Sequence, residues 1–397
     1  MTRTAAAPLA PDTRRRIVFV INSLGYGGAE RVLANILQHS EARLSEVKLD
    51  LVLLDAEPER RAMPAFVTKH VLDARGDLFA SIAGLTGKLR ALAPDLVVSF
   101  LVRANVAAIV AARRLGVPCV ISERMHLTRH LEGKYSWPKR AAAALPPRIA
   151  YRFADRVIAV SEGVRQNVVR EFGVRPEAAV TIYNPYDLER IAREAAIAPE
   201  WTPPGDFIVA AGRLAPAKNF AALIDAYLAS GLRESLVILG EGPERERLQA
   251  KIDAAGAHAR IHMPGYLDNP FAVVARASFF VSASLSEGFP NAMAEAMALG
   301  VPVVATDCLS GPAELLAGIV KADSAALMEA DFGILVPEHD AAELARAMRL
   351  MAAPERRARY AERARARMAA FSVQHVADEY WRVLREAMRS VRPAQGI

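Results

Sequence analysis

The stretch from Ser282 to Thr306 constrains the fold of this chain more strongly than any other segment. An apolar run typical of a buried strand precedes it at residues 277–281, and a second such run ends it at residues 301–305. The residues between these two runs have the composition of a short helix. The pattern therefore predicts a βαβ unit. The turn ahead of its helix is expected at the carboxyl edge of a parallel sheet, where such folds bind ligands.

The helix inside this unit has recognisable ends. Pro290 occupies the expected first helical position, residues 291–299 are mostly good helix formers, and Gly300 is expected to stop the helix. Backbone amides around Phe289 and Asn291 are expected to face an anion, because a helix N-terminus carries unpaired N–H groups and a partial positive charge.

Two carboxylates frame the same turn. Glu287 precedes the helix, and Glu295 lies a little over one turn inside it. A carboxylate can accept two hydroxyl donors at once, which suits the vicinal diol of a sugar or a ribose. The alternative interpretation is that Glu287 is a helix-start charge and that Glu295 belongs to a solvated helix face.

The composition bounds the class of protein. The 397 residues, 52% of them hydrophobic, predict a globular chain long enough for two domains. Cys119 and Cys308 are the only cysteines, which argues against a disulfide scaffold and fits a reducing, cytoplasmic compartment. Residues 1–16 contain no adequate apolar h-region, so we expect a disordered lead-in rather than a signal peptide. No apolar run reaches the roughly 18 residues that a spanning helix needs. The protein is therefore expected to be cytoplasmic, either soluble or peripheral on the inner membrane.

Positive charge is concentrated in the first half of the chain. Residues 1–199 contain 29 Lys and Arg against 20 Asp and Glu, whereas the remainder contains 21 against 24. The first half is therefore expected to bind an acidic partner.

Residues 124–156 combine eight Lys or Arg and two acidic residues with interleaved aromatic and apolar side chains. This mixture suits an anionic membrane surface, and the alternative is a solvated insertion over the cleft. No nucleic-acid partner is expected, because the chain has no RNA- or DNA-binding motif.

Strand-like apolar runs alternate with helix-like stretches along the whole chain, which predicts a doubly wound parallel sheet in each half. The expected strands are residues 16–21, 47–54, 96–100, 118–121, 157–160, 207–211, 236–239, 261–264, 277–281 and 301–305. A proline-rich stretch suited to a hinge lies between the halves. We therefore expect one domain over residues 14–197, a linker over 198–206 and a second domain over 207–371.

The turn after the first strand is rich in glycine and leads into an expected helix at residues 32–38. Gly27 and Gly28 would let the backbone approach a ligand closely, although the turn lacks the full spacing of a dinucleotide site. The alternative is that these glycines only tighten the connection. After the strand at 207–211, Arg213 and Lys218 are two cations that could together grip a diphosphate. The alternative here is two exposed loop charges.

The spacing of Glu287 and Glu295, with seven residues between them, resembles the signature of the retaining GT-B glycosyltransferases of family 4. The resemblance covers nearly the whole chain. It implies two Rossmann-like domains facing a cleft, with a C-terminal helix over residues 372–391 that crosses back to the first domain. Apolar residues at helical spacing in that tail require a surface on which to pack.

The resemblance also assigns roles to individual residues. In the family the first Glu and the amides after it hold the donor sugar, the second Glu holds the ribose, and an Arg and a Lys neutralise the leaving diphosphate. The implied catalytic residues are Arg213, Lys218 and Glu287. The implied donor-binding residues are Gly212, Gly240, Glu241, Tyr266, Gly288, Phe289, Pro290, Asn291 and Glu295.

On the acceptor side the resemblance implies Gly27, Gly28, Glu30, Glu123, Arg124 and His126. Many relatives place a His directly after the fifth strand, near the donor sugar. Here Arg124 occupies that position and His126 follows two residues later. An ordinary loop histidine is therefore the alternative for His126.

The expected activity is transfer of a hexose or N-acetylhexosamine, with retention of configuration, from a nucleoside diphosphate sugar. UDP is the expected nucleotide, and the acceptor is expected to be a lipid-linked or polysaccharide precursor. No Asp-x-Asp occurs in the chain, so no metal and no other cofactor is expected. Two alternatives stay open: a nucleotide-sugar 2-epimerase of the same architecture, and a non-catalytic scaffold that binds sugar nucleotides.

Overall fold

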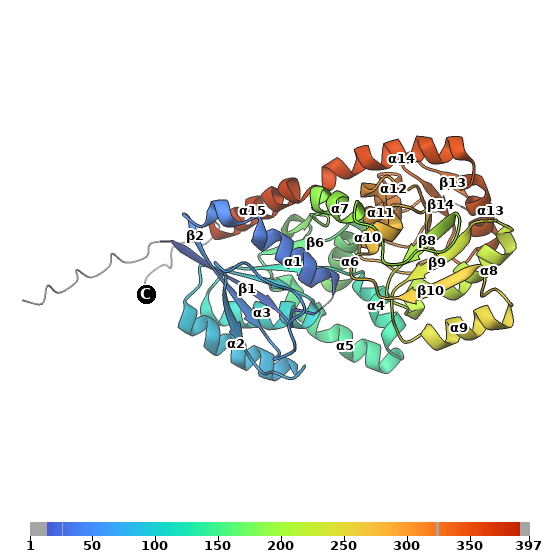
Figure 1. Cartoon of the computed structure of the whole chain (residues 1–397). Helices are drawn as coiled ribbons and strands as arrows, with labels where there is room; N and C mark the ends of the chain where they lie inside the picture. Colours follow the sequence, from blue (N-terminus) through green and yellow to red (C-terminus); the bar gives the residue numbers. More distant parts are fainter. Residues whose placement is uncertain (1–13, 26, 323–324, 390–397) are drawn as a thin grey trace, which may run out of the picture.

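The protein consists of two lobes, the first built around a parallel sheet and the second around a sheet that is parallel except for one edge strand (Figure 1). The computed structural model describes residues 14–25, 27–322 and 325–389. The expected lead-in at residues 1–16 therefore falls almost entirely outside the described residues. The described residues form two seven-stranded sheets, which confirms the predicted pair of doubly wound domains.

The first sheet has the strand order β3-β2-β1-β4-β5-β6-β7, and all neighbouring strands are parallel. Its strands are β1 (Arg15–Ile21), β2 (Val47–Leu53), β3 (Thr68–Val71), β4 (Leu96–Phe100), β5 (Cys119–Glu123), β6 (Arg156–Ala159) and β7 (Ala179–Thr181). The helices of this lobe are α1 (Gly28–Gln38), α2 (Leu78–Leu92), α3 (Val102–Leu115), α4 (Leu127–Lys134), α5 (Trp137–Ala150) and α6 (Glu162–Phe172).

The central strands are apolar on both faces because helices cover both faces of the sheet. In β1, Ile17 and Phe19 belong to the core under α1, whereas Val18 and Val20 belong to the core under α2 and α3. The edge strand β3 is largely exposed and lacks an apolar run, which is why the sequence did not reveal it.

The second sheet has the order β10-β9-β8-β11-β12-β14-β13, with β13 antiparallel at its edge. Its strands are β8 (Phe207–Ala211), β9 (Ser235–Leu239), β10 (Ile261–Gly265), β11 (Phe280–Ser282), β12 (Val303–Thr306), β13 (Met328–Glu329) and β14 (Ile334–Val336). The helices that follow β7 are α7 (Leu188–Ala195), α8 (Phe220–Ser230), α9 (Arg245–Ala254), α10 (Pro270–Val274), α11 (Asn291–Ala298), α12 (Pro312–Leu316), α13 (Ala341–Met351), α14 (Pro354–Met368) and α15 (Val373–Arg389).

Two helices begin at other residues than expected. α1 begins at Gly28 rather than at residue 32, so Glu30 and Arg31 lie in its first turn. α11 begins at Asn291, and Pro290 is its N-cap residue rather than its first helical residue.

The chain crosses between the lobes at two neighbouring points. Tyr186 N donates to Phe371 O at 2.9 Å, and Val373 N donates to Tyr186 O at 2.9 Å. After the first crossing, α7 packs against α10 and α11 of the second lobe, ahead of the expected linker at residues 198–206. The two crossing segments are therefore hydrogen-bonded side by side, as in a hinge.

The last helix returns to the first lobe, as predicted. Figure 1 shows α14 along the second lobe and α15 continuing over the first. Tyr380, Trp381 and Leu384 are buried in the core beneath α1, and Trp381 Nε1 donates to Ser40 Oγ at 3.1 Å. Within the described residues, no helix is both long enough and apolar enough to cross a bilayer.

Candidate active site

The turn between β11 and α11 holds Glu287 in a defined orientation. Its Oε1 accepts from Lys218 Nζ at 2.5 Å and from Ser284 Oγ at 2.7 Å. The backbone carbonyl of Glu287 accepts from Ser310 Oγ at 2.5 Å. Glu287 Oε2 makes no hydrogen bond to any described residue. This second oxygen is therefore available to accept ligand hydroxyls.

Lys218 and Arg213 come from the loop after β8. Lys218 ends a short 3-10 turn, Pro216–Lys218, and the loop is tied to the Glu287 turn because Leu285 N donates to Ala217 O at 2.8 Å. The Arg213 side chain is exposed and makes no hydrogen bond or ion pair to the described residues. One cation is thus already held beside Glu287, and the other is free to meet an anion.

The next two loops lie beside this one at the same edge of the sheet. Gly212 N donates to Leu239 O at 3.0 Å, and Gly240 N donates to Gly265 O at 2.9 Å. Glu241 forms an ion pair with Arg245 at 2.8 Å. Tyr266, directly after β10, is 59% exposed. This rim therefore presents backbone groups and the exposed Tyr266, whereas Glu241 is paired with Arg245 at the start of α9.

The start of α11 offers backbone amides rather than side chains. Phe289 is buried and packs against Tyr183 and Phe371, with ring centroids 5.2 and 5.8 Å apart, so its side chain belongs to the core. Pro290 has no N–H, and the helix has no side-chain cap. The first helical amides are therefore left for an anion.

The side chain of Asn291 forms hydrogen bonds within the protein. Its Oδ1 accepts from Asn184 Nδ2 at 2.6 Å and from the Tyr186 hydroxyl at 2.7 Å. Gly28 of α1 lies against the same amide group: a Cβ at that glycine would be 3.0 Å from Asn291 Nδ2. The predicted donor helix is therefore docked on the first lobe through Asn291.

Glu295 is also bonded across the cleft. Arg31 Nη1 of α1 lies 2.5 Å from Glu295 Oε1, with both side chains mostly buried. The Glu295 carboxylate raises the pKa of Arg31. Arg31 was not predicted from the sequence, although its position directly after Glu30 in the glycine-rich turn was an available signal.

The β5 turn of the first lobe touches the Glu287 turn through its backbone. A Cβ at Gly288 would collide with the Arg124 carbonyl and would lie 2.9 Å from Met125 Cα. Only glycine permits this approach. Gly288 therefore allows the two lobes to meet directly at the predicted donor site.

The predicted acceptor residues of this turn lie in different surroundings. Glu123 is fully buried, and its carboxylate accepts from the Tyr151 hydroxyl at 2.7 Å and from Arg124 N at 2.9 Å. Burial raises the pKa of Glu123. The Arg124 side chain donates to Asn184 and, at 3.0 Å, to the Tyr380 hydroxyl of α15. Glu123 therefore supports the turn from the interior, whereas Arg124 is half-buried and bonded to Asn184 and to α15.

His126 is the N-cap residue of α4, where its Nδ1 accepts from Arg129 N at 3.4 Å. It lines a pocket of about 410 Å³ between α4, α6 and the segment at residues 309–321. Burial lowers the pKa of His126, which favours the neutral imidazole. His126 is therefore the predicted acceptor residue of the β5 turn that reaches an interlobe pocket.

The glycine-rich turn brings the remaining acceptor-side residues to the cleft. Gly27 is the N-cap residue of α1, and Gly27 and Gly28 are exposed. The Glu30 side chain folds back against Gly27, and burial raises the pKa of Glu30.

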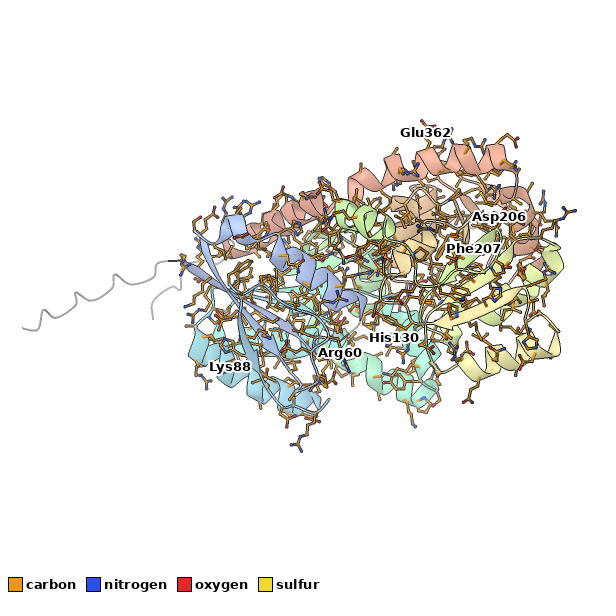
Figure 2. All side chains as sticks on the ribbon, in the orientation of Figure 1. Arg60, Lys88, His130, Asp206, Phe207 and Glu362 are labelled. Carbon is orange, nitrogen blue, oxygen red and sulfur yellow. The ribbon has the colours of Figure 1, made fainter. Side chains whose placement is uncertain are left out.

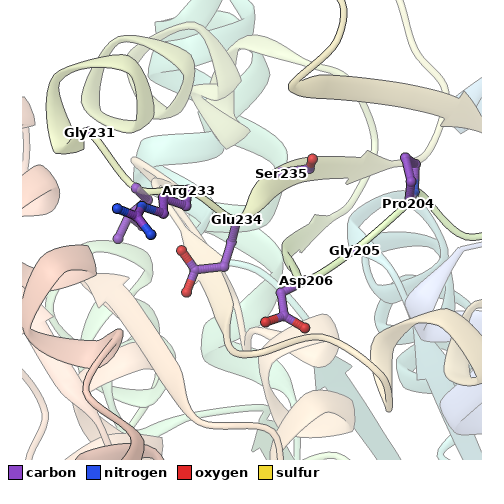
Figure 3. A pocket seen from close by; sticks show the side chains of 8 residues that line it. Pro204, Gly205, Asp206, Gly231, Arg233, Glu234 and Ser235 are labelled. Carbon is purple, nitrogen blue, oxygen red and sulfur yellow. The ribbon is translucent and has the colours of Figure 1, made fainter.

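A larger pocket of about 540 Å³ lies elsewhere (Figure 3). It is lined by Pro204–Asp206 and Gly231–Ser235, at the amino-terminal ends of β8 and β9. This edge of the sheet is opposite the carboxyl edge that bears Arg213 and Lys218. The pocket contains none of the predicted site residues, so we do not assign the active site to it.

Family models match both halves of the chain. A family model described as "Glycosyltransferase Family 4" matches residues 26–190, and one described as "Glycosyl transferases group 1" matches residues 205–353. The N-acetylgalactosamine-N,N'-diacetylbacillosaminyl-diphospho-undecaprenol 4-alpha-N-acetylgalactosaminyltransferase of Campylobacter jejuni is 27% identical over 380 residues, which cover 91% of this chain and 97% of the relative. The lipopolysaccharide 1,6-galactosyltransferase of Salmonella typhimurium is 28% identical over 188 residues, 46% of this chain and 51% of the relative.

Solved structures share the architecture. Anabaena Alr3699/HepE in complex with UDP and glucose has a TM-score of 0.71 and 22% identity, covering 94% of this chain and 100% of that chain. The sucrose-phosphate synthase of Thermosynechococcus elongatus has a TM-score of 0.77 and 16% identity, covering 95% of this chain and 100% of that chain. At these identities the likeness concerns the fold.

Proposed function

Because this chain is a glycosyltransferase of family 4 with the GT-B fold, we propose that it transfers a hexose or N-acetylhexosamine from a nucleoside diphosphate sugar. The proposed acceptor is a lipid-linked or polysaccharide-precursor glycan, and the anomeric configuration is retained. The observation that carries this proposal is the Lys218–Glu287 pair, 2.5 Å apart, beside the N-terminus of α11. This pair places a cation that can bind phosphate next to a carboxylate that can accept hydrogen bonds from sugar hydroxyls.

The donor would span the second lobe from Tyr266 to Glu287. Glu287 Oε2 would accept sugar hydroxyls, and Glu295 Oε2 would accept the ribose hydroxyls while Arg31 keeps Oε1. Arg213, Lys218 and the first amides of α11 would hold the diphosphate, since charge-assisted hydrogen bonds to phosphate are strong. UDP is the proposed nucleotide, and support comes from the HepE structure, which contains UDP and glucose.

The proposed chemistry needs no covalent enzyme intermediate. The bond between the sugar C1 and the diphosphate oxygen breaks, and the acceptor oxygen bonds to C1 on the same face. The acceptor proton passes to the departing phosphate oxygen, so atoms and charge balance. Arg213, Lys218 and the helix N-terminus stabilise the negative charge that develops on the leaving group.

Two side-chain cations serve here where other folds use a metal on the diphosphate. We therefore expect transfer to continue in EDTA. The measurement is release of nucleoside diphosphate from a panel of donors, with and without chelator, in the presence of a glycan acceptor. Loss of activity in EDTA that returns with Mg²⁺ or Mn²⁺ would contradict the metal-free proposal.

Donor incubated without acceptor should yield no epimer, which separates transfer from epimerisation.

The proposed acceptor is presented at an anionic membrane. The Campylobacter jejuni relative is named for a diphospho-undecaprenol-linked acceptor. In this chain, α5 and the turn after it expose Trp137, Leu145, Ile149 and Phe153. Leu145 and Ile149 are four residues apart and so lie on the same face of α5. Basic residues flank these side chains. Aromatic and apolar groups at headgroup depth, with lysines and arginines above them, are typical of peripheral attachment at the inner membrane.

Binding to vesicles tests this surface. Near an anionic bilayer each basic residue contributes about 1 kcal/mol, so changing Lys134, Lys139, Arg140 and Arg148 to Glu should abolish co-sedimentation. Leu145→Ser should weaken it, whereas Ile197→Ser at the end of α7 should not, although the two side chains are 56% and 57% exposed. If the wild-type protein does not co-sediment with anionic vesicles at low salt, the membrane proposal is refuted.

A further inference from the structure

Glu314 belongs to α12 of the second lobe, but its carboxylate binds the first lobe. Glu314 Oε2 accepts from Glu162 N at 2.7 Å and from the Tyr183 hydroxyl at 3.0 Å, and Oε1 accepts from Gly163 N at 3.0 Å. The two amides are the first ones of α6, which would otherwise lack partners. One side chain therefore caps a helix of the opposite lobe.

This arrangement depends on both carboxylate oxygens. Glu314 is 2% exposed, and burying a carboxylate costs free energy unless donors surround it. Burial raises the pKa of Glu314, and the hydrogen bonds from α6 oppose that rise. An isosteric glutamine would keep one acceptor, but its NH₂ group would face a backbone N–H. The site is thus specific for a carboxylate.

The same contact reaches the donor turn. A Cβ at Gly163 would lie 2.7 Å from Leu309 O and 2.7 Å from Ser310 Cβ, so α6 lies directly on this segment. Ser310 in turn donates from its Oγ to Glu287 O at 2.5 Å. The path from α6 to the Glu287 carbonyl therefore passes through two direct contacts.

We propose that Glu314 is a positioning residue that latches the two lobes together and thereby sets the Glu287 turn for the donor. The hinge for this closure is formed by Tyr186 and residues 371–373, where the two crossing segments are hydrogen-bonded. The proposed latching of the two lobes rests only on the contacts described above. The proposed effect on turnover rests, in addition, on the proposed glycosyl transfer.

The distance between the lobes tests the latch without any substrate. Lys88→Cys on α2, which is labelled in Figure 2, and Gln249→Cys on α9 place fluorophores on different lobes (Figure 1). The native Cys119 and Cys308 are buried and should not label. In this doubly labelled protein, Glu314→Gln and Gly163→Ala should both lower the efficiency of energy transfer between the two fluorophores, because the lobes move apart. The first removes an acceptor, and the second adds a Cβ that pushes against the backbone of the other lobe.

Glu162→Gln is the matched control. Its carboxylate sits at the same helix N-terminus but bonds Arg165 and Thr181 within the first lobe. This variant should keep the wild-type lobe distance. The latch is wrong if Glu314→Gln and Gly163→Ala both keep the wild-type distance while the labelled protein remains folded.

Turnover gives the second readout. Glu314→Gln and Gly163→Ala should lower kcat/KM for the donor roughly ten- to a hundredfold, as for a lost charge-assisted hydrogen bond, and should raise the donor KM. A purely structural lesion would lower the melting temperature and the active fraction but leave KM unchanged, and that result would overturn the positioning role. If the wild-type protein transfers no sugar, the proposed function fails, whereas the distance measurement still decides the latch.

Discussion

Lys218→Ala is expected to lower kcat about 10²–10³-fold, the range for removing one group that stabilises developing negative charge. Lys218 is the cation already held in the site, 2.5 Å from Glu287. The substitution removes the charge beside the leaving diphosphate and leaves Glu287 Oε1 with Ser284 as its remaining partner. The measurement is the steady-state rate of nucleoside diphosphate release at saturating donor.

The control is Lys251→Ala in the same lobe. Lys251 is also ion-paired, to Asp225 at 2.6 Å, but it lies on α9 away from the cleft. It should turn over at the wild-type rate. A Lys218→Ala enzyme that retained wild-type kcat would contradict the assignment of this lysine to the leaving group.

Glu295→Ala and Glu287→Ala are expected to fail in different ways. The first should weaken binding of the free nucleoside diphosphate roughly ten- to a hundredfold, the cost of one charge-assisted hydrogen bond. The second should lower kcat while leaving the affinity for free nucleotide nearly unchanged, because Glu287 is assigned to the sugar. Calorimetric titration with the nucleoside diphosphate measures the first effect, and turnover measures the second.

Arg31→Ala is the companion to Glu295→Ala. It removes the partner 2.5 Å from Glu295 Oε1 but leaves the carboxylate in place. It should therefore weaken nucleotide binding less than Glu295→Ala does. Equal losses of nucleotide affinity in the Glu287 and Glu295 variants would refute the division of labour between the two carboxylates.

The fold was predictable because its signals are local. Central strands such as β1 and β8 are continuous apolar runs bounded by turn residues, and α15 has one apolar stripe that requires a surface. Two of the edge strands, β3 and β13, were not predictable. β3 is exposed on most of its length and β13 has two residues, so neither has a hydrophobic pattern.

The donor half of the candidate site was also predictable in part, because Glu287, Asn291 and Glu295 lie in one short segment. What the sequence could not reveal is which partners they have across the cleft. Arg31 and Asn184 reach this segment only through tertiary packing.

The same limit explains Glu123. Its position after a parallel strand suggested a residue facing the cleft, but the fold buries it under Tyr151. Strand-end position predicts which edge of the sheet a residue occupies. It does not predict whether the side chain turns inward, because neighbouring helices decide that.

The anomeric configuration of the product tests the proposed retaining transfer most directly. Donor with an α-linked sugar would be incubated in EDTA with a polyprenyl diphosphate-linked N-acetylhexosamine in anionic vesicles, and the product's anomeric proton would be observed by NMR. Transfer with retention of configuration predicts an α-linked product formed together with an equal amount of nucleoside diphosphate. A β-linked product, or release of nucleotide with no sugar on any acceptor, would contradict it.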